Sequence, residues 1–525
     1  MDRILVTETI AEEGIAALRT AAEVDIHTNL DKAQLIELLP NYDALIVRSA
    51  TKVTADVLAA GERLRVVGRA GTGVDNIDVN AATERGILVV NAPAANSVAA
   101  AELTITFIMA LARRLPDANT SLKSGKWERS KFMGFEVRGK TIGLIGLGRI
   151  GTEVARRARG LEMNVLAYDP VVSTDRAEQL GITLASMDDV LTQSDFLSVH
   201  VPLIDSTRHM INAARLAQMK PTAYLINAAR GGIVDENALL EAIEKGVIAG
   251  AALDVFEQEP PPADSPLLKH PRIITTPHLG ASTVEAQALA GVDVAESVLT
   301  ALAGGTPRAA VNAPFVAPEE WAVLAPYIKL AQQLGTLCTQ LIQNPVRSYE
   351  FEYRGELANV ETAPLRLALL QGLLTGVCEQ RVTPVNAPLL ARERGLKYTE
   401  RSNSTAENYA SLLVLRAETA DGVHEFAGTV LRDEQHIVEV DGYWVDFLPS
   451  GPLLMTYHRD RPGMIGRVGT LLGAVDVNIS GMYVGRQAPR AQAMMVLTLD
   501  DPVPADVLAQ INNEPGVDKA YSVIF

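Results

Sequence analysis

The chain has 525 residues, of which 48% are hydrophobic and 21% charged, and its formal net charge is −16 at pH 7. This length exceeds what one hydrophobic core usually supports, so we expect several globular domains. The acidic balance disfavours nucleic acid and membranes as partners, because both need dense cationic surface. Residues 3–7 have the pattern of a first strand rather than a secretory signal, and no stretch is long and apolar enough to cross a bilayer. We therefore expect a cytoplasmic protein, and its two cysteines exclude a disulfide framework.

The first 96 residues alternate short β-branched runs with helical patterns. Such alternation predicts a parallel sheet flanked by helices, so the chain is expected to be of the α/β class here. The expected strands are 4–6, 24–26, 44–47 and 65–67, and the expected helices are 12–19, 32–39 and 55–60.

Residues 97–281 carry a glycine motif that predicts a dinucleotide site. Gly146, Gly148 and Gly151 lie between an apolar strand, 141–145, and a helical run, 150–159. Glycines in this setting let the backbone approach a pyrophosphate at a helix N-terminus. Asp169 ends the next expected strand, where a carboxylate accepts hydrogen bonds from ribose hydroxyls. The acid favours NAD over NADP as the cofactor.

Three polar residues farther along suit the oxidation of a secondary alcohol. This reaction needs a base for the hydroxyl proton while a hydride leaves the same carbon. His278 can serve as that base, and Glu259 can orient its ring. Arg230, beside two glycines, offers a planar fork for a substrate carboxylate. No metal is expected.

The remainder of the chain predicts a return to the first domain and then two further domains. A helical run from residue 282 to about 302 suggests that the first domain resumes over 282–312, with the active-site cleft between the two units. Glycine and proline mark a linker over 304–307 and 311–318. Residues 318–450 mix helices and strands and show no catalytic pattern. Residues 453–525 follow the order strand, helix, strand, strand, helix, strand, which is the split βαβ sandwich.

Several segments resemble the D-isomer-specific 2-hydroxyacid dehydrogenase family, and within it the long phosphoglycerate dehydrogenases. The most specific are Val47-Arg-Ser-Ala-Thr, Gly68-Arg-Ala-Gly-Thr-Gly-Val-Asp-Asn, Gly125-Lys-Trp-Glu-Arg and residues 227–235. The resemblance implies a Rossmann-like NAD-binding domain (97–281) inserted in a flavodoxin-like substrate-binding domain (1–96 and 282–312). An intervening α+β domain (318–450) and a ferredoxin-like ACT regulatory domain (453–525) would follow.

The same resemblance implies an activity and a set of site residues. The reaction would be the NAD-dependent oxidation of 3-phospho-D-glycerate to 3-phosphohydroxypyruvate, the first step of L-serine biosynthesis. Arg230, Glu259 and His278 would be catalytic. The implied substrate-binding residues are Arg48, Arg69, Gly71, Gly73, Asn96 and, from a neighbouring subunit, Arg129 or Lys131. Besides the glycine motif and Asp169, the implied cofactor-binding residues are Thr72, Arg149, Ile150, Ala228, Asp254 and Gly280.

The resemblance also implies regulation and assembly. ACT domains bind an amino acid near the turn between their first strand and first helix, here with His458 and Asp460, together with the residue after the helix, Asn478. L-serine is the expected effector, because it is the end product of the pathway. A homotetramer is the expected assembly.

Two other functions remain open at this point. One is a broader 2-hydroxyacid dehydrogenase acting on hydroxypyruvate or glyoxylate, although such relatives usually stop near Pro314. The other is a non-catalytic NAD-sensing binding protein, against which the complete set of Arg230, Glu259 and His278 argues. Turnover with each substrate distinguishes these functions.

Overall fold

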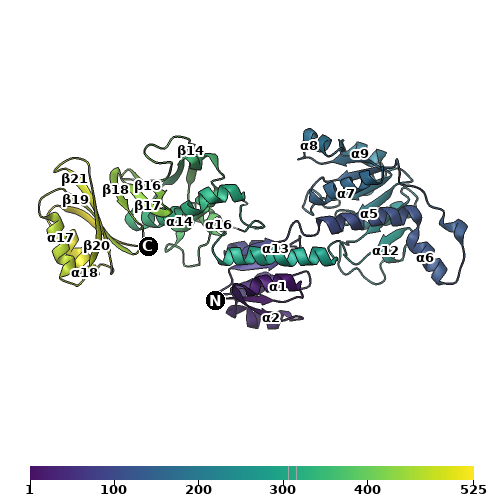
Figure 1. Ribbon diagram of the computed structural model, residues 1–525, viewed down its shortest axis with the longest axis horizontal. Helices are drawn as coiled ribbons and strands as arrows, with labels where there is room; N and C mark the ends of the chain where they lie inside the picture. Colours follow the sequence, from purple (N-terminus) through teal and green to yellow (C-terminus); the bar gives the residue numbers. More distant parts are fainter. Residues whose placement is uncertain (306, 315) are drawn as a thin grey trace.

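The computed structural model describes residues 1–305, 307–314 and 316–525. Residues 306 and 315, both in the expected linker, lie outside the described residues. Figure 1 shows an extended molecule, with residues 97–281 at one end and the C-terminal helices α17 (Met464–Gly473) and α18 (Ala505–Asn512) at the other. No helix among the described residues is long and apolar enough to cross a membrane.

The first domain is built on a five-stranded parallel sheet in the order β2-β1-β3-β4-β5. This is the flavodoxin-like strand order, as predicted. The strands are nearly continuous apolar runs because helices cover both faces. The strands are β1 (Asp2–Val6), β2 (Ala22–Ile26), β3 (Ala44–Val47), β4 (Val66–Arg69) and β5 (Leu88–Asn91), and the helices are α1 (Glu12–Arg19), α2 (Lys32–Leu38), η1 (Leu39–Asn41), α3 (Ala55–Ala60) and α4 (Val79–Glu84).

Helix α13 (Val284–Leu302) completes this first domain from far along the chain. It packs against α1 so closely that a Cβ on Gly14 would lie 2.6 Å from the carbonyl oxygen of Gly291. Its residues Val294 and Val298 share one hydrophobic cluster with Ile4. Figure 1 shows α13 lying beside α1, so the predicted return of the chain is observed.

The second domain is a seven-stranded sheet in the order β12-β11-β10-β9-β6-β7-β8. All of its pairings are parallel, and the strand order reverses between β6 and β9, where α/β proteins bind ligands. The strands are β6 (Thr141–Ile145), β7 (Asn164–Tyr168), β8 (Thr183–Leu184), β9 (Phe196–Val199), β10 (Tyr224–Asn227), β11 (Gly250–Leu253) and β12 (Ile273–Thr275). The helices are α5 (Ser97–Arg113), α6 (Leu115–Lys123), η2 (Arg129–Phe132), α7 (Arg149–Gly160), α8 (Thr174–Gln179), α9 (Met187–Gln193), α10 (Ala213–Leu216), α11 (Glu236–Glu244) and α12 (Pro266–Lys269).

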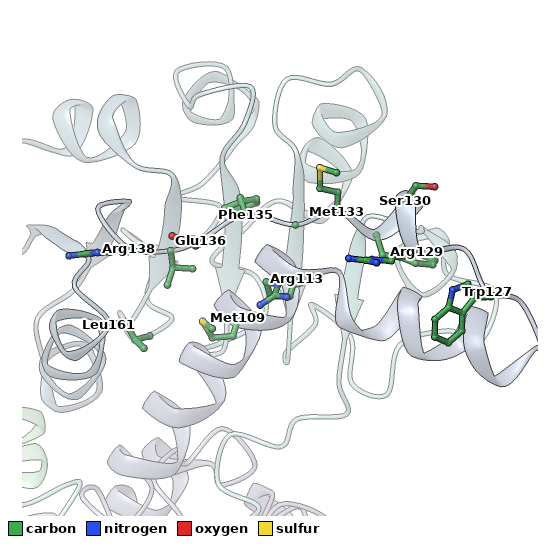
Figure 2. Close-up of a pocket in the computed structure, with 13 residues that line it drawn as sticks. Met109, Arg113, Trp127, Arg129, Ser130, Met133, Phe135, Glu136, Arg138 and Leu161 are labelled. Carbon is green, nitrogen blue, oxygen red and sulfur yellow. The ribbon is translucent and has the colours of Figure 1, made fainter.

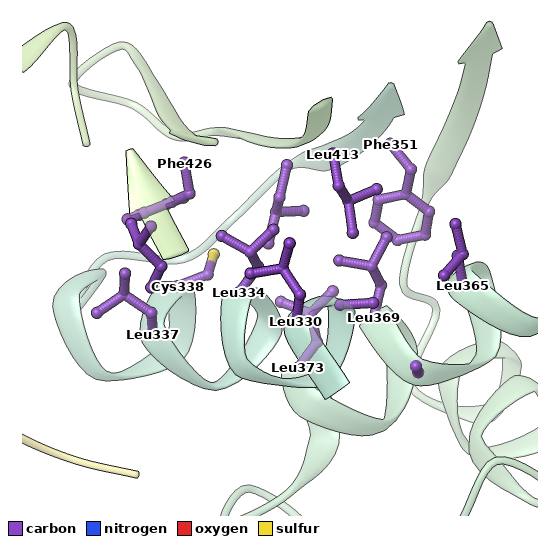
Figure 3. Packing of buried hydrophobic residues seen from close by; sticks show 14 of the residues in the cluster. Leu330, Leu334, Leu337, Cys338, Phe351, Leu365, Leu369, Leu373, Leu413 and Phe426 are labelled. Atoms are coloured by element: carbon purple, nitrogen blue, oxygen red, sulfur yellow. The ribbon is translucent and has the colours of Figure 1, made fainter. Parts of the chain in front are cut away.

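The third domain is a mixed six-stranded sheet in the order β14-β13-β15-β16-β17-β18, with helices against one face. Figure 3 shows leucines of α14 and α15 meeting Phe351 and Leu413 of the sheet. The strands are β13 (Ser348–Gly355), β14 (Tyr398–Asn403), β15 (Ser411–Glu418), β16 (Val423–Leu431), β17 (Glu434–Val440) and β18 (Tyr443–Phe447), and the helices are α14 (Pro318–Leu341), η3 (Glu356–Asn359), α15 (Ala363–Leu374) and α16 (Ala387–Glu393).

The fourth domain is a four-stranded antiparallel sheet in the order β20-β21-β19-β22, as the split βαβ order predicts. Its elements are β19 (Pro452–Arg459), α17 (Met464–Gly473), β20 (Ile479–Arg486), β21 (Gln492–Leu499), α18 (Ala505–Asn512) and β22 (Val517–Ile524). Met455 and Val496 belong to the same buried cluster as Leu341 and Phe447 of the third domain. The third and fourth domains therefore share one hydrophobic cluster, and a second cluster, between the fourth sheet and its helices, belongs to the fourth domain alone.

Candidate active site

A cleft of about 590 Å³ lies between the first two domains. Its lining comes from segments that follow the parallel strands of both sheets, where strand ends converge. The first domain contributes Arg48, Arg69, Gly71, Thr72, Gly73, Asp75 and Asn96, and the second contributes Arg230, Phe256, Glu259 and His278. The structure thus brings the three predicted catalytic residues and the five predicted substrate residues of the first domain to one place.

The centre of the cleft is a histidine–carboxylate pair. Nδ1 of His278 lies 2.7 Å from Oε2 of Glu259, and Oε1 of Glu259 accepts a hydrogen bond of 3.0 Å from the backbone N–H of Phe256. Burial raises the pKa of Glu259, but the bonds from His278 and Phe256 more than offset it, so this pKa lies below its ordinary value. The glutamate is therefore ionised and holds the ring with Nε2 left to face a substrate.

Asp254 organises the loop that carries this histidine. Its side chain is fully buried, and it accepts bonds from the Thr276 hydroxyl at 2.5 Å and from the N–H groups of Leu279 and Gly280 at 2.7 and 2.8 Å. These three bonds set the course of residues 276–280, in which His278 has a left-handed φ of 55°. The carboxylate has no exposed surface here, so contact between Asp254 and a nicotinamide carboxamide stays a prediction.

The glycines at 71 and 73 leave room for two arginines. A Cβ on Gly73 would lie 2.1 Å from Nη2 of Arg230, and one on Gly71 would lie 2.6 Å from Nη1 of Arg69. Nε of Arg230 is 3.2 Å from Asp75, which the sequence analysis did not single out. The family resemblance marked both glycines as substrate-binding, and the structure places an arginine side chain against each of them.

The cleft is electropositive. Three arginines, Arg48, Arg69 and Arg230, line it against two carboxylates, those of Asp75 and Glu259. Burial and then the charge of Arg230 lower the pKa of Arg69, as expected where cations gather around an open space. An anionic substrate would supply the missing negative charge.

Side chains beneath the cleft hold this arrangement. Nε of Arg69 donates to Asn76 at 3.0 Å, and Thr72 donates to Asn96 at 2.7 Å. Glu8 accepts bonds from the N–H groups of Arg48, Ala50 and Thr51. Burial raises the pKa of Glu8, but these bonds more than offset it and keep the carboxylate charged. Glu8 and Asn76 were not predicted, because their role depends on loops that meet only in the folded domain.

The glycine motif fits a dinucleotide. Gly146 has a left-handed φ of 99°. A Cβ on Gly151 would lie 2.1 Å from the carbonyl oxygen of Gly146, so the turn into α7 requires glycine at both positions. A Cβ on Gly148 would meet nothing within 4 Å, which leaves this side open to a ligand. Arg149 and Ile150 form the first turn of α7, where free backbone N–H groups favour a pyrophosphate.

Asp169 stands at the end of β7, as predicted. Its carboxylate accepts a bond of 2.8 Å from the N–H of Leu147 and further bonds from Val171 and Val172. Burial raises its pKa, but these backbone bonds more than offset it. The acid is therefore ionised beside the glycine loop and retains lone pairs for ribose hydroxyls.

His200 is a residue that the sequence analysis missed. It follows β9 at the reversal of strand order, and a Cβ on Gly146 would lie 2.6 Å from its carbonyl oxygen. Nε2 is 2.9 Å from the Ser198 hydroxyl, and Nδ1 is buried with no partner among the described residues. Burial lowers the pKa of His200 to about 4, so the ring is neutral under the cofactor loop.

Two predicted substrate residues do not reach the cleft of their own chain. Arg129 and Lys131 lie on η2, and Lys131 pairs with Glu128. Figure 2 shows Arg129 at a separate surface pocket with Trp127 and Met133, each of which is 83% exposed. Their contribution to a neighbouring subunit's site stays a prediction.

The predicted effector residues His458 and Asp460 precede α17 and Asn478 follows it, but their side chains have partners in the domain. His458 is only 3% exposed, and its Nδ1 lies 3.1 Å from the Thr456 hydroxyl. Asp460 accepts bonds from the N–H of Arg490 and, at 3.3 Å, from the Arg486 side chain. Asn478 donates to Asp500 at 2.7 Å. Effector binding at these residues also stays a prediction.

Comparison with known proteins covers the whole chain. Residues 105–280 match the NAD-binding domain of D-isomer-specific 2-hydroxyacid dehydrogenases, 323–441 the D-3-phosphoglycerate dehydrogenase intervening domain, and 453–516 the ACT domain. The chain is 46% identical to D-3-phosphoglycerate dehydrogenase of Synechocystis sp. over 100% of its length and 95% of that protein. It is 45% identical to the Archaeoglobus fulgidus protein of the same name, over 99% of both.

Solved structures match part of this chain. D-lactate dehydrogenase from Aquifex aeolicus, complexed with NAD and lactic acid, is 30% identical with a TM-score of 0.54 and covers 59% of this chain and 99% of its own. A putative D-3-phosphoglycerate dehydrogenase from Ralstonia solanacearum is 32% identical with a TM-score of 0.52, over 59% of this chain and 96% of its own. With the full-length relatives and all three domain matches, the chain belongs to the D-3-phosphoglycerate dehydrogenase family, in its form with an intervening and an ACT domain.

Proposed function

We propose that this protein is a cytoplasmic enzyme that oxidises 3-phospho-D-glycerate to 3-phosphohydroxypyruvate with NAD, in the first step of L-serine biosynthesis. The observation that carries the proposal is the pair of His278 and Glu259, 2.7 Å apart, facing three arginines in one cleft. Relatives named for this activity match the chain at full length.

His278 is the base. Its Nδ1 is occupied by Glu259, so Nε2 accepts the hydroxyl proton of the substrate, and the ionised glutamate compensates the charge that the ring acquires. Arg230 holds the substrate carboxylate and stabilises the carbonyl oxygen as it forms. NAD, when bound, accepts the hydride from the same carbon.

The cofactor would lie along the loops at the carboxyl ends of the second sheet. Gly146, Gly148 and Gly151 fit the pyrophosphate, and Asp169 fits the adenosine ribose. The remaining residues that we assign to the cofactor are Thr72, Arg149, Ile150, Ala228, Asp254 and Gly280.

Arg48 and Arg69 would favour a substrate with a second negative charge, such as a phosphate. Arg129 or Lys131 of a neighbouring subunit would complete this site. The exposure of Trp127 and Met133 beside Arg129 supports an interface there, because large apolar side chains are seldom left to water in groups. We infer a homotetramer, and a monomer by light scattering at micromolar concentration would contradict it.

The fourth domain would provide feedback. L-serine would bind near His458, Asp460 and Asn478 and favour a less active state. Because Asp460 is already hydrogen-bonded to Arg490 and Arg486, binding would have to replace or extend these contacts. If serine weakens substrate binding, substrate must weaken serine binding by the same factor.

The test is the rate of NADH oxidation with 3-phosphohydroxypyruvate and with hydroxypyruvate, each with and without millimolar L-serine. A strong preference for the phosphorylated keto acid, reduced by serine, would support both the substrate and the effector. Equal rates that serine leaves unchanged would indicate a broader 2-hydroxyacid dehydrogenase. No turnover with either keto acid would indicate a binding protein.

A further inference from the structure

A second cavity, distinct from the cleft, lies where the first and third domains meet. Its volume is about 320 Å³, at the small end of the range of roughly 300–1,000 Å³ for small-molecule sites. Leu88 of β5 and Ala301 of α13 line it from the first domain. Trp321 and Ile328 of α14 and Leu367 of α15 line it from the third. Most of the lining is therefore apolar.

Two arginines bring positive charge to this apolar cavity. Arg65 has partners, since it pairs with Asp2 at 2.5 Å and donates to the carbonyl of Leu302 at 3.1 Å. Arg381 also lines the cavity; its backbone carbonyl accepts a bond of 2.9 Å from Asn386, but its guanidinium, on an exposed residue, has no partner within the part of the chain that the structure describes. Burial and then the charge of Arg65 lower the pKa of Arg381. One guanidinium at this junction thus lacks a negative partner.

We propose that this cavity binds a small organic carboxylate with an aromatic or branched apolar body. The fork of Arg381 would hold the carboxylate in two parallel hydrogen bonds. The apolar body would lie against Trp321 and Ile328, whose largely apolar surfaces could replace little of the hydration of a fully polar ligand. Inorganic phosphate alone therefore fits the site less well than an aryl carboxylate.

The cavity adjoins the contact that docks the third domain on the first. Thr383, which is 8% exposed, donates to the carbonyl of Gly86 at 3.1 Å. Asn386, which is 1% exposed, reaches the carbonyl of Glu84 at 3.4 Å. Gly86 and Thr383 are also in the cavity lining. A ligand in the cavity would therefore touch both sides of the docking contact.

Strand β5 leads from this contact toward the active-site cleft. It begins at Leu88, and its last residue, Asn91, donates its side-chain N–H to the carbonyl of Thr72. Asn312 of the linker binds the start of this strand. Its side-chain oxygen accepts a bond of 2.8 Å from the N–H of Val89, and its side-chain N–H donates to the carbonyl of Ile87 at 3.0 Å. Occupation of the cavity would thus reduce hydrogen exchange over residues 84–91.

Calorimetric titration of the full-length protein with phenylacetate tests the proposal and does not depend on the catalysed reaction. We expect saturable binding that Arg381→Gln weakens by at least about tenfold, which corresponds to about 1.4 kcal/mol. Arg394→Gln, which changes an exposed arginine outside the cavity, should leave binding unchanged. The neutral isostere phenylacetamide should bind more weakly than phenylacetate.

A second variant, Ile328→Trp, fills the cavity from α14 and should abolish phenylacetate binding while the circular dichroism spectrum is retained. Absence of phenylacetate binding to the wild-type protein, or equal binding to the wild type and Arg381→Gln, would overturn the proposal. Unchanged binding to a folded Ile328→Trp protein would also overturn it. So would Arg381-dependent binding of inorganic phosphate without binding of phenylacetate.

Discussion

The two halves of this molecule use the same kinds of charged residues in opposite ways. In the N-terminal half, Arg230 and the pair of His278 and Glu259 face an open cleft of about 590 Å³. In the C-terminal half, Arg416 is enclosed by Glu350, Glu352 and Glu425. A charged cluster therefore indicates chemistry only where the fold leaves space for a substrate beside it.

The halves also differ in how their domains meet. The first and second domains have separate hydrophobic clusters, with the cleft between them. The third and fourth share a cluster that runs from α14 to β19 and β21. Tyr457 of β19 also donates to Asp441 of the third domain at 2.7 Å. We expect the first pair to move about a hinge and the second pair to behave as one unit.

The largest expected effect is a loss of kcat that should occur at one histidine–carboxylate pair and not at a second, similar pair. His278→Asn should lower kcat by about 10²–10⁴-fold, because it removes the base while leaving the fold intact. The matched control is His436→Asn, since His436 lies 2.6 Å from Asp446 in the third domain, away from the active-site cleft. Steady-state kinetics and thermal unfolding of both variants test the distinction. Comparable losses of kcat in the two would contradict it.

The next effect concerns the enclosed arginine. Arg416→Gln removes one of the two arginines that pair with Glu352, which is 3% exposed, and the same arginine also pairs with Glu350 and Glu425. It should therefore destabilise the C-terminal half by about 3–5 kcal/mol. Basal turnover should change little, because the cleft lies in the other half. Arg401→Gln, on the exposed edge strand β14, is the control and should have little effect on stability. Denaturant unfolding compares the two variants, and equal stability would refute the prediction.

The shared core predicts joint unfolding. Met455→Ala in β19 should destabilise by about 2–4 kcal/mol through the cavity that it leaves. Hydrogen exchange should rise in α14 of the third domain as well as in the fourth, because both contribute to one cluster. Val294→Ala in the first domain should leave exchange in α14 unchanged. A response of the fourth domain alone would show that the two domains unfold independently.

The smallest effect is a pH dependence. Burial raises the pKa of Glu352, but bonds from Arg354 and Arg416 more than offset it, so its folded pKa lies below the ordinary 4.5. A depressed pKa contributes stability that is present above the unfolded value and lost as pH falls through the folded one. The denaturant concentration at the unfolding midpoint of the C-terminal half should therefore decrease as the pH is lowered below about 4.5. In Glu352→Gln this decrease should be smaller. An identical pH profile in this variant would contradict the assignment.

The amino-acid sequence alone determined the fold classes of the domains and the cofactor motif, and it was sufficient to propose the catalytic residues. These depend on local patterns: strands alternating with helices, glycines before α7, and polar residues after strands β10 to β12. In a parallel sheet such residues meet at one edge, which is why Arg230 and His278 could be placed together before their distance was known.

Only the tertiary structure decided the features that arise where distant segments meet. Gly71 and Gly73 leave room for arginines, Asp254 is buried beneath the histidine loop, and His458 is enclosed in its own sheet. The same holds for the cavity at Arg381 and for the core shared by the third and fourth domains. Burial and unpaired charge are properties of packed surfaces, and no local pattern of residues specifies which surfaces will be packed together.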